Sequence, residues 1–76
     1  MKLINSAGGN VFFSLDGQDF QQLANGDSEL VKSNGAQPHL IKYHNGTQVV
    51  EYELDPAGAY GFEWQGQTLA LLQIQG

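Results

Sequence analysis

The chain contains no cysteine. A disulfide framework, a thiolate metal site and a cysteine nucleophile are therefore excluded. At 76 residues the chain is also small for a self-sufficient hydrophobic core, and small domains usually compensate with such covalent or metal links. We therefore expect one marginally stable domain, spanning residues 1–76, that gains stability from a partner.

Basic residues are almost as scarce. The chain has no arginine and three Lys against eight Asp and Glu, giving a formal net charge of −5. Binding to phosphate needs clustered Lys or Arg, and reading a guanine needs the Arg fork. Anionic membrane surfaces likewise select basic clusters. The composition is that of an acidic protein and argues against both nucleic acid and membrane as partners.

Long apolar runs are missing as well. No stretch approaches the roughly 20 apolar residues of a spanning helix, and residues 1–6 turn polar too soon for a signal peptide. If Met1 is the native start, we expect a cytoplasmic protein.

Glycine, by contrast, is abundant. The ten glycines follow Asn, Asp or Gln in most cases and recur roughly every eight to twelve residues, which is typical of short hairpins. The pattern predicts an all-β fold, a small antiparallel sandwich or partly closed barrel of about seven to eight short strands joined by Gly-containing hairpin turns. The candidate turns are Gly8-Gly9, Asp16-Gly17, Asn25-Gly26, Asn34-Gly35, Asn45-Gly46, Pro56-Ala57-Gly58 and Gln65-Gly66.

Turn positions fix the register of a hairpin and therefore the face of each side chain. With Asn45-Gly46 as a two-residue loop, the core face carries Ile41, Tyr43, Val50, Tyr52 and Leu54. With Asp16-Gly17 as the loop, the core face carries Val11, Phe13, Leu15 and Phe20. Phe12 and Leu23 then lie on the opposite face, which requires either a bulge near residues 21–22 or contacts on both sides of this strand pair.

The last hairpin is apolar on both faces. With Gln65-Gly66 as its loop, the core face carries Tyr60, Phe62, Trp64, Leu69 and Leu71. The reverse face carries the small and apolar residues Ala59, Gly61, Ala70, Leu72 and Ile74. Such a strand can be buried on both faces inside a barrel or sandwich. Alternatively, the reverse face is the contact surface for a partner, which small residues would let approach closely.

Catalytic and metal-binding patterns are not found in the sequence. No serine stands in a Gly-x-Ser-x-Gly elbow. His39 and His44 are five residues apart, which places them on opposite faces of one strand. The acidic turns at 16–19 and 25–29 depart from the alternating ligand pattern of a calcium loop. We therefore expect no enzyme activity, no cofactor and no metal.

The sequence thus favours a non-catalytic protein-interaction module, either an accessory subunit of a larger assembly or a homo-oligomer. Its predicted partner surface is the reverse face just described. The alternative is a carbohydrate- or small-ligand-binding β-sandwich module, in which Trp64 stacks on a sugar and Gln65 and Gln67 supply hydrogen bonds.

Overall fold

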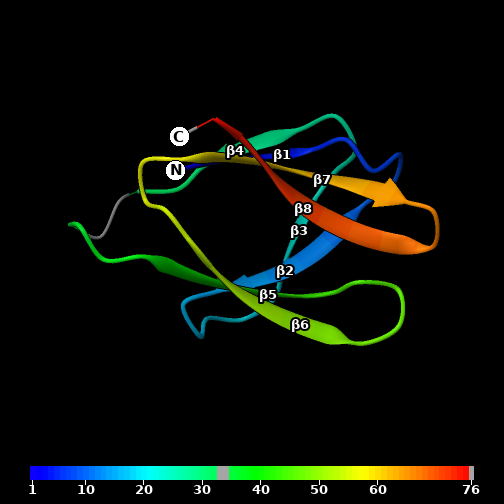
Figure 1. Ribbon diagram of the computed structural model, residues 1–76, viewed down its shortest axis with the longest axis horizontal. Coiled ribbons are helices and arrows are strands. Elements are labelled where there is room, and N and C mark those ends of the chain that lie inside the picture. The colour runs from blue at the N-terminus through cyan, green and yellow to red at the C-terminus, as the bar shows by residue number, and fades with distance from the viewer. Residues whose placement is uncertain (33–34, 76) are drawn as a thin grey trace.

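The computed structural model describes residues 1–32 and 35–75, and within these ranges the chain forms strands and no helix (Figure 1). The all-β prediction is therefore confirmed. The strands are β1 (Lys2–Asn5), β2 (Val11–Leu15), β3 (Gln21–Leu23), β4 (Ser28–Leu30), β5 (His39–His44), β6 (Val49–Leu54), β7 (Ala59–Gln65) and β8 (Thr68–Gln75). The described part of the chain contains no helix that could cross a membrane.

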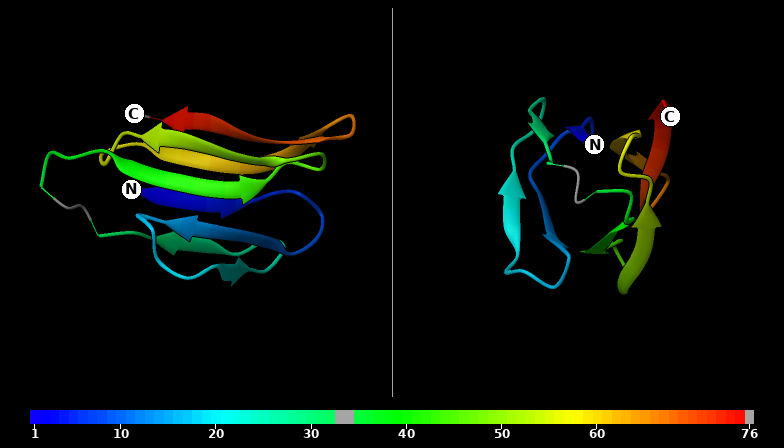
Figure 2. Two further views of the ribbon diagram at one scale, coloured as in Figure 1. Left: turned by 90° about the horizontal axis from the view of Figure 1, so that it is seen from below. Right: turned by 90° about the vertical axis from the view of Figure 1, so that its left-hand side faces the viewer.

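The strands form two four-stranded sheets. Sheet A has the order β4-β1-β7-β8, and sheet B has the order β3-β2-β5-β6. Seen along the strands, the two sheets lie one above the other, with β6 and β8 on the same side (Figure 2). The molecule is a small sandwich, and the barrel does not close. One strand pair, β1 with β7, is parallel, which is possible because no hairpin joins these two strands.

The core lies between the sheets and is mostly aliphatic and aromatic. Phe62 of sheet A contacts two rings of sheet B, those of Phe13 and Tyr43, with centroid distances of 5.9 and 5.3 Å. Burying each such side chain contributes about 1.5–3 kcal/mol. The buried hydrophobic residues are Leu3, Val11, Phe13, Leu15, Leu23, Ile41, Tyr43, Leu54, Tyr60, Phe62 and Leu69.

The first hairpin differs from its prediction. Asp16 and Gly17 do have the positive φ angles, 54° and 77°, of a tight turn, and Gln18 N donates to Leu15 O at 2.9 Å. Strand β3 begins only at Gln21, however, so that Val11 faces Leu23 and Phe13 faces Gln21. The connection has an odd number of residues, which reverses the predicted faces of the returning strand.

Phe20 was therefore wrongly predicted as core. It lies in the connection between β2 and β3 and is 55% exposed, whereas Leu23 is buried. Phe12 lies on the outer face, as predicted, and is exposed.

The other two hairpins keep their predicted faces in a shifted register. The β5–β6 connection has four residues, with His44 opposite Val49, and the β7–β8 loop is Gly66-Gln67, with Gln65 opposite Thr68. Each register is shifted by two residues, and a shift of two leaves every side chain on its own face.

Burial nevertheless differs from the prediction at two positions. Tyr52 and Trp64 have the predicted direction but are 48% and 47% exposed. Tyr52 belongs to an edge strand and Trp64 lies near a hairpin loop, where the opposite sheet gives less cover.

Two further predicted turns form, and a third lies partly outside the described residues. A turn forms at Asn25-Gly26, where Asp27 N donates to Ala24 O at 3.0 Å, and another at residues 55–58, which links the two sheets rather than closing a hairpin. The predicted Asn34-Gly35 turn includes Asn34, which lies outside the described residues.

Candidate functional site

The outer face of sheet A brings the five predicted partner-binding residues together. Across the sheet, Ile4 lies beside Gly61 and Gly61 lies beside Leu72, so that these residues form one row on the face turned away from the core. Ala59 and Ala70 lie on the same face and are half-buried. Leu72 and Ile74 are exposed.

Gly61 contributes to this surface indirectly. A Cβ at position 61 would lie 2.8 Å from Ile74 Cδ1, so the Ile74 side chain lies directly over the glycine. Gly61 itself is buried. The missing side chain lets Ile74 lie flat on its own sheet, and a partner would touch Ile74 rather than Gly61.

Two residues that the sequence analysis missed extend this surface. Ile4 of β1 is half-buried, and Leu30 of β4 is strongly exposed and lies opposite Lys2. Both reach the surface through pairing between strands that are not joined by a hairpin, and local turn signals do not reveal such pairing. We call the set of Ile4, Leu30, Ala59, Gly61, Ala70, Leu72 and Ile74 the sheet A patch.

The sheet A patch is electrically balanced. By register, one Lys and one Glu share its face: Lys2 lies opposite Ala59, and Glu63 lies opposite Ala70. The net charge of −5 therefore resides elsewhere, including on Glu51 and Glu53 of sheet B. This face therefore carries one charge of each sign and none of the acidic excess of the chain.

The predicted ligand-binding residues lie at one end of the molecule, where the β5–β6 and β7–β8 hairpin loops meet (Figure 1). Leu69 N donates to Asn45 O at 2.7 Å across the two sheets. The Trp64 ring packs on Gly46, since a Cβ there would lie 3.1 Å from a ring carbon. Half of the indole remains exposed next to Gln65 and Gln67, which are both exposed.

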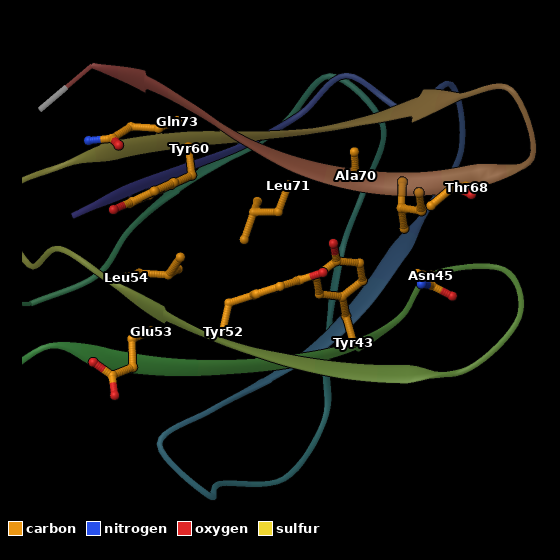
Figure 3. A pocket seen from close by; sticks show the side chains of 11 residues that line it. Tyr43, Asn45, Tyr52, Glu53, Leu54, Tyr60, Thr68, Ala70, Leu71 and Gln73 are labelled. Carbon is orange, nitrogen blue, oxygen red and sulfur yellow. The ribbon is translucent and has the colours of Figure 1, made fainter.

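A cavity of about 370 Å³, the side cavity, opens between the edges of β6 and β8 (Figure 3). Its lining is apolar and aromatic in the middle and polar at the rim. Tyr43 and Tyr52 stack obliquely within it, with ring centroids 6.1 Å apart. The lining residues are Tyr43, Asn45, Tyr52, Glu53, Leu54, Tyr60, Thr68, Leu69, Ala70, Leu71 and Gln73.

Two of the hydroxyl groups that line the side cavity, those of Tyr43 and Tyr60, form hydrogen bonds with the backbone. Asp55 N donates to Tyr60 Oη at 2.7 Å, and Tyr43 forms a hydrogen bond with the Leu71 backbone. Burial raises the pKa of Tyr43, the nearby Tyr52 raises it further, and the Leu71 bond partly opposes both effects. Tyr43 thus remains a neutral phenol well into the alkaline range.

His39 and Asp16 form the one ion pair within the described residues, with Nδ1 and Oδ2 2.8 Å apart. The hydrogen bond with His39, together with the Leu40 N–H that donates to Oδ1 at 2.9 Å, lowers the pKa of Asp16. The pair holds the Asp16-Gly17 turn against the start of β5. His39 is buried at the start of β5, an inner strand, and its Nε2 lacks a hydrogen-bond partner.

His44 lies on the opposite side of β5 and accepts a hydrogen bond from Gly46 N through Nδ1 at 3.1 Å. The two histidines diverge, as their spacing predicted. Within residues 1–32 and 35–75, no group of three or more His, Asp or Glu is placed to hold a metal ion.

Compared with known proteins, the chain matches no protein-family model, no curated protein and no solved structure.

Proposed function

We propose that this protein is a non-catalytic interaction module that associates through the sheet A patch. The observation that supports this most is the gathering of Ile4, Leu72 and Ile74 on one charge-balanced outer face of a domain this small. Exposed apolar patches of this kind mark interaction surfaces, because leaving them in water is costly.

The partner we propose is a second copy of the chain. Two sheets that pack face to face lie about 10 Å apart, and the space between them is filled by apolar side chains such as those of the sheet A patch. This packing also leaves the acidic residues of sheet B pointing into solvent on both sides. An accessory role in a larger assembly is the other form of the same function, with a different protein on the same face.

A non-catalytic role is supported by what the histidines do. His39 is held by Asp16 and His44 by the Gly46 amide, so both have structural hydrogen bonds. Ser14, which lies near the Asp16-Gly17 turn, donates its hydroxyl to Gln18 O at 2.6 Å. The hydrogen bonds of these side chains stabilise loops.

The test is the mass in solution of two matched variants. Leu72 of the sheet A patch is 37% exposed and Leu40 of sheet B is 42% exposed, so Leu72→Gln and Leu40→Gln make the same change on opposite faces. We expect a concentration-dependent dimer by light scattering. Leu72→Gln should weaken it at least about tenfold, because each dimer buries the unsatisfied amide twice, and Leu40→Gln should not.

A folded wild-type protein that stays monomeric at every concentration would exclude self-association. Equal effects of the two variants would exclude the sheet A patch as the contact surface. Circular dichroism on the same samples shows whether each variant has remained folded.

A second candidate function is carbohydrate binding at Trp64. It is supported by the half-exposed indole of Trp64 near the exposed residues Gln65 and Gln67, since an exposed indole can stack on a sugar ring. The chain has a single tryptophan, so its fluorescence emission reports on this position alone. A saturable change on titration with a glycan panel would favour this function, and an unchanged spectrum would exclude it for the glycans tested.

A further inference from the structure

Four strands lie at sheet edges, and they differ in how much of their backbone is available to pair with an added strand. Strands β3 and β4 have three residues each. Strand β8 is long, but Leu69 N already donates to Asn45 O, and the Leu71 backbone is bonded to Tyr43. Strand β6, with six residues, is the edge that remains for strand addition.

Every second residue of β6 has backbone N–H and C=O groups that point out of the sheet edge and can pair with an added strand. Asn45 N donates to Gln48 O, which marks the first hydrogen-bonded position of the β5–β6 hairpin. Because bonded and non-bonded pairs alternate along an antiparallel ladder, the N–H and C=O groups of Val49, Glu51 and Glu53 point away from β5. In the described part of the chain, no other strand pairs with this edge.

The side cavity lies directly inside this edge. Tyr52 and Leu54 of β6 line it from one side and Leu71 of β8 from the other (Figure 3). A strand added to β6 would place its inward side chains beside Tyr52, which is only half covered by the chain itself. Those inward side chains must be apolar to match the lining.

On the outer face of β6, basic side chains of an added strand are favoured instead of apolar ones. Glu51 and Glu53 lie on it, and Lys42, opposite Glu51, is the only Lys or Arg on the neighbouring β5. No ion pair to either Glu is found within the described residues. An added strand would place its outward side chains next to these two carboxylates, where Lys or Arg is favoured and Asp or Glu is disfavoured.

From these features we infer that the β6 edge binds an extended segment of a partner protein in which basic and apolar side chains alternate. The backbone of the segment pairs with β6, its apolar side chains enter the side cavity, and its basic side chains lie beside Glu51 and Glu53. A second copy does not fit, because it carries the same acids and its three lysines do not alternate with apolar residues. This binding site does not depend on the sheet A patch.

The experiment uses a short amidated peptide of alternating lysine and valine. A second peptide has the same composition with its lysines and valines in separate blocks, and a third alternates glutamate with valine. We expect saturable binding of the first peptide alone. On binding, the amide signals of Val49, Glu51 and Glu53 should shift in NMR spectra and exchange more slowly with solvent, while those of Val50 and Tyr52, already paired with β5, should keep their protection.

A charge variant and a matched control test the recognition. Glu51→Gln together with Glu53→Gln should weaken binding about three- to tenfold, as expected for two cross-strand charge pairs. Glu63→Gln removes an exposed carboxylate from the outer face of sheet A and should leave the affinity unchanged. Each substitution is at an exposed position, so the fold should be retained.

Several results would overturn the inference. Equal binding of the block peptide would show diffuse attraction to an acidic protein, and binding of the glutamate peptide would exclude charge recognition. Amide shifts confined to β8 would place the peptide elsewhere. Shifts at β6 that grow with protein concentration alone would identify a second copy as the occupant.

Peptide binding by a monomeric protein would support this site while excluding self-association through the sheet A patch.

Discussion

At the scale of single residues, the buried side chain of Asn5 has a structural role that no hydrophobicity pattern predicts. The side chain is 1% exposed, and all of its polar atoms are used. Nδ2 donates to Gly9 O and Leu23 O, both at 2.8 Å, and Oδ1 accepts from Ala7 N at 2.9 Å. Asn5 thereby fixes the chain where it passes from sheet A to sheet B.

Asn5→Asp should therefore destabilise the protein strongly. The substitution keeps the shape but replaces the donor with an oxygen that faces two carbonyl oxygens, and it places a charge in a buried site. We expect a loss of about 3 kcal/mol or more in the free energy of unfolding, measured by urea titration. Asn10→Asp makes the same change at an exposed position and should stay within about 0.5 kcal/mol. Similar losses for both variants would contradict the role of Asn5.

Some residues could be predicted from the sequence and others could not. The alternation in β5 and β7 identified Ile41, Tyr43, Tyr60 and Phe62 as core, because parity alone decides the face of a strand residue. Asn5 is a polar residue, and its burial depends on carbonyl groups that only the folded chain brings together.

At the scale of elements, the two hairpin loops at one end of the sandwich are fitted to each other through Gly46. Its φ is 107°, and a Cβ there would lie 2.7 Å from Gln67 O as well as against the Trp64 ring. The loops approach closely because this position has no side chain.

Gly46→Ala should cost more than the same change at an open turn. Strain at the positive φ contributes about 1–3 kcal/mol, and the contact with Gln67 O adds to it. Gly26, with a φ of 83° and no atom near its Cβ position, is the matched control. We expect Gly46→Ala to unfold at lower urea than Gly26→Ala and to change Trp64 emission, which Gly26→Ala should leave unaltered. Identical midpoints and spectra would show that the loops are not in contact.

The hairpins show what turn chemistry can and cannot predict. Asn-Gly, Asp-Gly and Gln-Gly marked where the chain reverses, but not how many residues each connection uses. In the β5–β6 and β7–β8 hairpins the predicted register was wrong by two residues, which leaves every side chain on its predicted face. The residues that β7 and β8 contribute to the sheet A patch were therefore correctly predicted to share one face. A single odd connection before Gln21 misplaced Phe20 and Leu23. The part of the patch supplied by β1 and β4 depends on pairing between distant strands and left no local signal.

At the scale of the whole molecule, Tyr43 links the sheets on the side where the sandwich is open. It belongs to β5 of sheet B, and its hydrogen bond reaches Leu71 of sheet A. Its raised pKa means that the folded protein holds the phenol proton more tightly than the unfolded chain does. As pH rises above the ordinary value of about 10, the unfolded state loses its proton first, and stability falls.

Tyr43→Phe should change this dependence in a defined direction. At neutral pH the variant should lose about 1 kcal/mol with the hydrogen bond to Leu71. Between about pH 8 and pH 11, its free energy of unfolding should decline less than that of the wild type, because no phenol remains to ionise on unfolding at this position. Urea titrations at both pH values provide the measurement. Parallel declines in the two proteins would locate the alkaline sensitivity elsewhere.

The parallel pairing of β1 with β7 has a consequence for the order in which the molecule is assembled during translation. The segment that becomes β1 is made before the other seven strands, whereas β7, its inner neighbour, is made after β2 to β6. Until then, the strands of sheet B can pair with one another, since all four precede β7 in the chain. Sheet A is completed only after β7 has been made, and until then β1 keeps one edge unpaired.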